Sequence, residues 1–195
     1  DIDDTLMLQY EVYLHSCGVT SNTSSFYMRI LRATYNRAVE KGFTPQRYPF
    51  RLVYTGVDKT VKRAIPLRCI KLIKELQLDD NKGLAFARDM FLFSFYTRGM
   101  SLIDIAFLTS RNLTGGRLTY TRHKTGQQLS VKWERCMQEI VDRYHREGAR
   151  YLFPIIKQEG IRERAQYKSR SSWICTKLKQ IGAMLCLDFP LTMYV

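Results

Sequence analysis

One stretch of the chain, residues 91–132, changes its hydrophobic period from helical to extended and so constrains the fold more than any other segment. Its first part, FLFSFYTRGMSLIDIAF, spaces apolar side chains as one face of a helix does, namely Phe91, Phe95, Leu102, Ile105 and Ala106. The opposite face of this predicted helix carries Arg98 and Ser101. Because these two residues are three apart, we expect them to project from much the same side.

The second part of the same stretch predicts a β-hairpin. Residues 117–122 and 127–132 alternate apolar and polar side chains, and HKTG at 123–126 supplies a turn that ends in glycine. Lys124 is therefore expected at the tip of a two-stranded support, beside Arg122 and His123. An apolar helix with an arginine, followed by a basic hairpin, is typical of a site that grips a phosphodiester.

The remaining patterns predict a mainly α-helical chain with a small antiparallel hairpin or sheet, an α+β class. Helices are expected at about 3–17, 22–41, 70–78, 84–96, 134–146 and 171–185. The apolar stripes that we expect to pack are Leu6, Tyr10, Tyr13 and Leu14 in the first helix and Tyr27, Leu31, Tyr35 and Ala38 in the second. Residues 151–156 read as extended, and the charged segment 161–170 as mobile or DNA-facing.

Proline and glycine divide the chain into two parts. Pro45, Pro49, Gly56 and Pro66 punctuate a polar stretch that ends in Lys59, Lys62 and Arg63. We therefore expect a helical domain at 1–58, a basic linker at 59–66 and a second domain at 67–195. Lysines in such a linker are suited to following the phosphates of a duplex.

The net charge favours a nucleic-acid partner. Lys and Arg number 31 against 18 Asp and Glu, which gives +13 and a sequence pI of about 9.7. Ribosomal, membrane-surface and heparin-binding proteins show the same excess, so charge alone names no partner. The second helix carries Arg29, Arg32 and Arg37, which either form a solvated face or contact a DNA backbone.

Other classes of protein are disfavoured. The five cysteines are scattered without a C-x-x-C pair, which predicts reduced, mostly buried thiols of a cytoplasmic protein and neither a metal site nor a disulfide. No apolar run approaches the roughly 18 residues of a membrane helix, and no signal-peptide pattern occurs.

Several ordered blocks resemble the tyrosine recombinases, or phage-type integrases, and most closely those of Bacteroides mobile elements. FYTRGMSLIDIAFLT and GGRLTYTRHKTGQQLSV resemble the family's catalytic core, and NTSSFYMRILRATYNRAVEKGF resembles the second half of its core-binding domain. YLFP at 151–154 and LTMYV at 191–195 resemble later landmarks. The resemblance implies a core-binding domain at 1–58 and the N-terminal part of a catalytic domain at 67–195.

This resemblance implies site-specific DNA recombination or integration. Members cut a DNA strand with a tyrosine, hold a 3′-phosphotyrosyl bond and rejoin the strand, without a metal or cofactor. The implied partner is double-stranded DNA at recombination sites, bound by a tetrameric synapse, and the implied location is the cytoplasm of a bacterium, at the nucleoid.

The resemblance also assigns the candidate catalytic residues. Lys124 corresponds to the hairpin lysine that helps to protonate the leaving oxygen. In most members the block reads T-G-L-R-x-S-E-L, and aligning Asp104 with the acidic residue puts Ser101 in the arginine position. We expect Arg98 to replace that arginine, with Ser101 as a hydroxyl contact. The alternatives are an Arg98–Asp104 ion pair, or Arg88 or Arg122 in the same role.

No His-x-x-Arg occurs in the 195 residues, although in the family this box follows the LTMYV-like strand. We therefore expect an internal fragment whose box and nucleophilic tyrosine lie beyond Val195, and we expect Tyr194 to be an extended, half-buried residue. Two alternatives remain open. One is a non-catalytic duplex-binding regulator on a recombinase scaffold, and the other is an unrelated RNA-binding protein.

Overall fold

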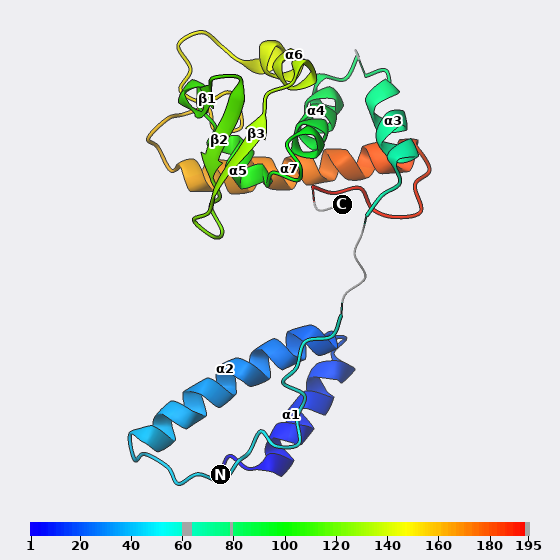
Figure 1. Cartoon of the computed structure of the whole chain (residues 1–195). Coiled ribbons are helices and arrows are strands. Elements are labelled where there is room, and N and C mark those ends of the chain that lie inside the picture. Colours follow the sequence, from blue (N-terminus) through cyan, green and yellow to red (C-terminus); the bar gives the residue numbers. More distant parts are fainter. Residues whose placement is uncertain (60–63, 79, 194–195) are drawn as a thin grey trace. The chain divides into compact units, whose positions relative to one another are not determined.

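The computed structural model describes residues 1–59, 64–78 and 80–193 and confirms a mainly helical chain with one small antiparallel sheet. Within these residues there are seven α-helices, one short 3-10 helix and three strands (Figure 1). The chain divides into two compact units, Asp1–Val61 and Lys62–Val195. Three residues with predicted features, Lys62, Arg63 and Tyr194, lie outside the described residues.

The first unit is built on two helices, α1 (Asp4–Ser16) and α2 (Ser21–Glu40). The Asp3 carboxylate caps α1 by accepting a hydrogen bond from the Leu6 N–H at 2.8 Å. Gly18, with φ of 78°, ends the first helix in the left-handed conformation that glycine adopts without strain. The core between the helices and the following segment is small: Met7, Leu14, Met28, Tyr35, Phe50 and Val53.

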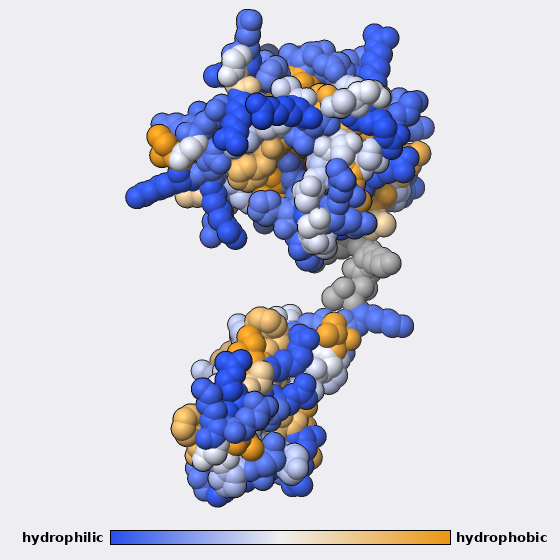
Figure 2. All heavy atoms as spheres, turned by 60° about the vertical axis from the view of Figure 1, so that its left-hand side comes forward, coloured by the Kyte–Doolittle hydropathy of each residue, from blue (hydrophilic) through white to orange (hydrophobic). Residues whose placement is uncertain are grey.

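The predicted packing faces of these helices are only partly right. Leu6, Tyr13, Tyr27 and Leu31 are exposed, and the buried side consists of Met7, Glu11, Leu14, Ser24, Ser25, Met28 and Tyr35. Apolar residues occur on more than one side of each helix, so the side that is buried is set by how α1, α2 and the segment after α2 pack together. Small serines are buried on α2 because the segment after it packs closely there. Apolar residues therefore reach the surface of this unit (Figure 2).

Residues 44–58, a polar stretch with prolines at 45 and 49, are hydrogen-bonded to both helices. The Tyr35 hydroxyl donates to the Pro45 carbonyl at 2.9 Å. The Ser25 hydroxyl donates to the Gly56 carbonyl at 2.5 Å, and the Tyr54 N–H donates to the Glu11 carboxylate at 3.1 Å. Since these bonds satisfy buried polar groups, the segment belongs to the folded unit as far as Asp58.

Helix α4 (Lys82–Tyr96) is the centre of the second unit, and nine of its 15 residues are buried. It packs against α3 (Leu67–Glu75), α6 (Arg135–Tyr144) and the long helix α7 (Glu163–Met184), as Figure 1 shows. The Asn81 side chain caps α4 by accepting from the Leu84 N–H at 3.1 Å. Burying each large apolar side chain here contributes about 1.5–3 kcal/mol relative to exposure.

The sheet has the order β1-β2-β3, with β1 (Leu113–Thr114), β2 (Arg117–Thr121) and β3 (Gln128–Lys132) all antiparallel. Leu118 and Tyr120 are buried on the inner face, opposite Val131 and Leu129 respectively. The structure therefore confirms both strands predicted from the alternating pattern, and it confirms which face of the hairpin is buried.

Two predictions about the C-terminal half are wrong. The helix expected at about 171–185 starts earlier, because α7 begins at Glu163 and includes most of the charged segment 161–170. The Arg170 guanidinium lies 3.8 Å from the Trp173 ring centroid and 5.0 Å from that of Phe86, a cation–π arrangement that holds this turn against α4. Residues 151–156 are buried but mostly turn, with a single β-bridge from Tyr151 to Thr109.

The cysteines also differ from expectation. All five are free thiols, but only Cys69 is buried, whereas Cys17 and Cys186 are exposed. No described helix combines the length and apolarity needed to cross a membrane. Across residues 1–59, 64–78 and 80–193, no three His, Cys, Asp or Glu side chains gather as metal ligands would.

Candidate nucleic-acid interface

The hairpin presents a short basic loop at its tip. The Arg122 N–H donates to the Gln127 carbonyl at 2.8 Å, and the Gly126 N–H donates to the Arg122 carbonyl at 2.8 Å. These bonds close a four-residue loop, 123–126, in which Gly126 has φ of 68°. Lys124 is exposed in this loop, as the sequence predicts. Its amino group can therefore meet a phosphate with little loss of protein contacts.

A buried carboxylate fixes the position of this loop. Asp104 is only 6% exposed and accepts the His123 N–H on one oxygen at 2.8 Å and the Ser101 hydroxyl on the other at 2.5 Å. Ser101 is itself the N-cap of α5 (Leu102–Ala106). The Asp104 anchor, meaning these two bonds, therefore brings Ser101 and the base of the Lys124 loop together. The S-x-x-D spacing of residues 101–104 is a capping signal that could have pointed to Asp104.

Aromatic stacking supports the same loop from the side. The His123 ring stacks on Phe107 with 5.9 Å between the centroids and 14° between the planes. Phe107 in turn meets the edge of Tyr151 at 5.7 Å. His123 is thus oriented both through its backbone and through its ring, and its exposed imidazole lies beside Lys124.

Arg98 does not share a helix with Ser101, so this part of the prediction is wrong. Helix α4 ends at Tyr96, Arg98 has φ of 61° and Gly99 has φ of 83°, and α5 starts only after the Ser101 cap. The left-handed residues and the cap break the helix that the apolar spacing predicts across 91–106. Phe95, which the apolar spacing predicts in the core, is 44% exposed near the end of α4.

The side chain of Arg98 lines a hollow of its own and makes no ion pair with a described residue. Arg98 borders a hollow of about 480 Å³ together with Ile65, Ile70 and Phe95, and Lys124 is not among the residues that line it. Arg98 forms no ion pair with any carboxylate in the described part of the chain, so the alternative Arg98–Asp104 pair is absent there.

The two other candidate arginines differ in their availability. Arg88 is committed to Asp89, at 2.9 Å, and to the Leu76 carbonyl, at 2.7 Å. Arg122 is half-buried at the neck of the hairpin. Burial and the Asp104 charge raise the pKa of Tyr120, whereas the Arg122 charge opposes them. Arg122 directly precedes His123, whose N–H Asp104 accepts, so Arg122 lies next to the Asp104 anchor.

The basic residues of the first unit are unequally free. The Arg32 guanidinium donates to the Thr55 hydroxyl at 3.1 Å, and Arg29 donates weakly to the Ser25 carbonyl at 3.4 Å. Arg37 and Lys59 are exposed. Arg37 and Lys59 thus remain the more available cations for an external phosphate.

Comparisons with known proteins agree with this architecture. Residues 1–52 match the family model described as Phage integrase SAM-like domain. Among solved structures, a lambda integrase dimer bound to a COC′ core site matches with a TM-score of 0.70 and 12% identity, covering 98% of this chain and 53% of that one. A lambda integrase (75–356) dimer on the same kind of site matches with a TM-score of 0.72 and 12% identity, covering 98% and 68%.

A lambda integrase tetramer bound to a Holliday junction also matches, with a TM-score of 0.66, 11% identity and coverage of 91% and 51%. The chain thus spans about half the length of the first of these structures, 53%. A search of curated protein sequences gave no match. The fold of this chain is therefore that of lambda integrase, and its first 52 residues match a phage-integrase SAM-like domain.

Proposed function

We propose that this chain is the DNA-gripping part of a tyrosine recombinase, which cuts and rejoins DNA through a 3′-phosphotyrosyl intermediate. In this proposal residues 1–58 are the core-binding domain, 59–66 a basic linker and 67–195 the N-terminal part of the catalytic domain. The parent protein acts on recombination sites of a mobile element of Bacteroides type, as a tetramer, in the bacterial cytoplasm at the nucleoid. The chemistry needs no metal or cofactor.

The observation that carries the proposal is the Asp104 anchor. It holds a basic hairpin loop and a serine hydroxyl together in a fold matched to DNA-bound integrases. In the proposed site Lys124 donates a proton to the departing 5′-oxygen, and Ser101 contacts the phosphate. Arg29, Arg32, Arg37, Lys59, Lys62, Arg63, Arg122 and His123 are the proposed DNA contacts.

A nicked duplex carrying a recombination site tests the reaction. A recombinase that contains this chain is expected to join a tyrosine to the 3′-phosphate of the cleaved strand and to release the short 5′-hydroxyl fragment between the cleavage point and the nick. Denaturing electrophoresis retains the resulting covalent protein–DNA adduct. Sequence-specific binding without any adduct would instead identify a non-catalytic regulator.

Duplex binding by this chain is expected to weaken steeply with salt. Each phosphate that the protein neutralises contributes about −0.9 to the slope of log K against log salt, so Arg37→Gln should make the slope shallower by about one. Filter binding across a salt series measures the slope. Arg135→Gln is the matched control because that guanidinium is paired with Glu139 at 2.9 Å. A slope near zero for the unsubstituted chain would contradict electrostatic binding.

Arg98→Ala is expected to lower adduct formation by about 10²–10³-fold, because a fixed cation stabilises the charge that builds up on the phosphate. Arg98→Lys should recover little of the lost cleavage rate, since a lysine ammonium cannot form the bidentate hydrogen bonds that a guanidinium makes to a phosphate. The measurement is single-turnover cleavage of the nicked duplex, with Arg122→Ala in parallel. Near-normal cleavage by Arg98→Ala combined with loss in Arg122→Ala would assign the role to the hairpin arginine.

A further inference from the structure

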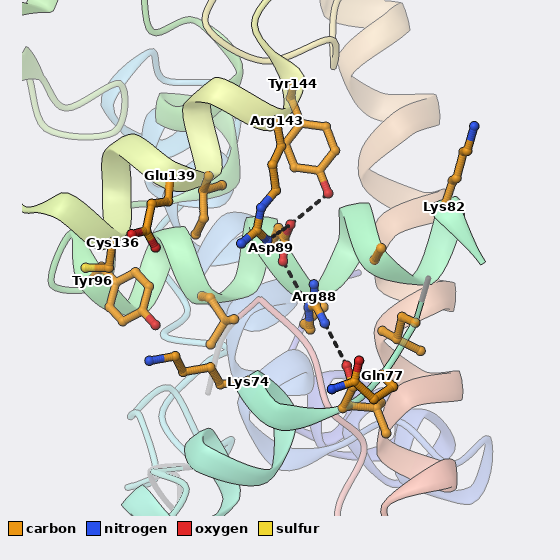
Figure 3. Close-up of a pocket in the computed structure, with 15 residues that line it drawn as sticks. Lys74, Gln77, Lys82, Arg88, Asp89, Tyr96, Cys136, Glu139, Arg143 and Tyr144 are labelled. Carbon is orange, nitrogen blue, oxygen red and sulfur yellow. Dashed lines mark hydrogen bonds and ion pairs between the residues drawn. The ribbon is translucent and has the colours of Figure 1, made fainter. Parts of the chain in front are cut away.

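A polar hollow of about 530 Å³ lies between α3, α4 and α6 (Figure 3). Its walls come from the end of α3 and the segment after it, from one side of α4, and from α6. Lys124, Ser101 and Arg98 do not line it, so it is distinct from the hairpin site described above. Ala85, Leu92 and Ile140 give it an apolar floor.

The charged groups of the hollow are unbalanced. Asp89, only 1% exposed, accepts from Arg88 at 2.9 Å, from Arg143 at 2.9 Å and from the Tyr144 hydroxyl at 2.8 Å. Lys74 also lines the hollow, and its amino group has no hydrogen bond or ion pair with a described residue. Four cations, Lys74, Lys82, Arg88 and Arg143, thus line the hollow against two carboxylates, Asp89 and Glu139, which leaves a formal surplus of two positive charges. The oxygens of Asp89 are already engaged, and Glu139 is also paired with Arg135.

The remaining donors can converge on an anion. Arg143 keeps unused N–H groups and half of its side chain, 51%, is accessible. In Figure 3 the Lys74 and Tyr96 side chains extend toward the same side of the hollow. Burial, followed by the Cys136 thiolate form and the Asp89 and Glu139 carboxylates, raises the pKa of Tyr96, and the opposing Arg143 charge is the smaller effect, so the hydroxyl stays protonated and able to donate.

We propose that this hollow binds a small ligand that carries a phosphate monoester, held by Lys74 and Arg143 with the Tyr96 hydroxyl as a neutral donor, while Arg88, bonded to Asp89 and the Leu76 carbonyl, contributes charge only. The formal surplus of two positive charges matches a phosphate monoester dianion, whereas a phosphodiester of DNA carries a single charge. Guanidinium groups suit phosphate oxygens geometrically. The volume and the apolar floor leave space for an organic group beyond the phosphate.

Calorimetric titration of this chain with inorganic phosphate and with adenosine monophosphate, at constant ionic strength, tests the proposal. Both are expected to bind saturably, and Lys74→Gln should weaken both by about tenfold, because it removes one charge-assisted contact. Lys71→Gln is the matched control, since Lys71 is exposed on the same helix but does not line the hollow. Lys74 makes no contact that the fold needs, so its replacement leaves the unit folded.

Alkylation of Cys136 gives a second readout that does not depend on heat of binding. This half-buried free thiol lines the hollow, so phosphate should slow its alkylation in the unsubstituted chain and not in Lys74→Gln, as peptide mass mapping can show. No saturation up to about 10 mM, or equal affinity in Lys74→Gln and Lys71→Gln, would overturn the proposal. Protection of Cys136 by a short duplex but by neither small ligand would also overturn it and make the hollow a DNA contact. None of these results depends on strand cleavage, so the recombinase proposal stands or falls separately.

Discussion

Lys124→Ala is expected to lower strand cleavage by a recombinase containing this chain by about 10²–10⁴-fold, the usual contribution of a positioned proton donor. Affinity for the duplex should change by less than about fivefold, because one phosphate contact among many contributes little to binding. The measurement is single-turnover cleavage of a nicked duplex beside a binding titration at the same salt concentration.

The matched control is Lys132→Ala at the other end of the same hairpin. Lys132 is also exposed and is paired with Glu134 at 3.2 Å, far along the strands from the loop. It should leave the cleavage rate unchanged. Cleavage by Lys124→Ala at the unsubstituted rate would remove Lys124 from the site and leave the loop as a DNA-positioning element.

Asp89→Ala is expected to destabilise the second unit by about 3–5 kcal/mol, because removing one partner of a buried ion pair leaves the others uncompensated. Asp89 joins α4 to α6 through Arg143 and Tyr144, and burial together with the Asp89 charge raises the pKa of Tyr144. Without the carboxylate, the Tyr144 hydroxyl and the Arg88 guanidinium lose their acceptor in a largely dehydrated position.

Urea unfolding followed by tryptophan fluorescence measures this effect. The chain has two tryptophans, Trp133 and Trp173, and both belong to the second unit, so the signal reports that unit alone. Asp142→Ala, on the exposed side of α6, should change the unfolding free energy by less than about 0.5 kcal/mol. Equal midpoints for the two variants would mean that the Asp89 network contributes no net stability.

The sequence predicts the hairpin best because its signals are local. Strict alternation and a glycine-ended turn specify β2, β3 and the Lys124 loop without help from distant residues. The helix across 91–106 fails for a related reason: apolar spacing continues through Arg98 and Gly99, and only the Ser101 cap reveals the break. The spacing of apolar side chains carries no information on backbone dihedral angles, so it cannot detect the left-handed residues that end the helix.

What depends on partners far along the chain could not be predicted. Three contacts depend on tertiary packing that the sequence does not show. They are the hydrogen bonds that hold residues 44–58, the stacking of Arg170 on Trp173 and the ion pair between Arg88 and Asp89. The candidate site shows the same division. The position of Lys124 follows from the turn. The local S-x-x-D spacing marks Asp104 as part of a helix cap, but its hold on the loop depends on a bond to a residue 19 positions away.

The Asp104 anchor grips position 123 through the main chain, and this has a consequence for how such a hairpin can change during evolution. Any residue except proline supplies the N–H that the carboxylate accepts. The side chain at 123 can thus be exchanged at the cost of its stacking on Phe107, while the main-chain bond to Asp104 stays. The side chain beside Lys124 can therefore change without moving Lys124. A mutation at position 123 can alter which groups the loop contacts while the lysine keeps its position.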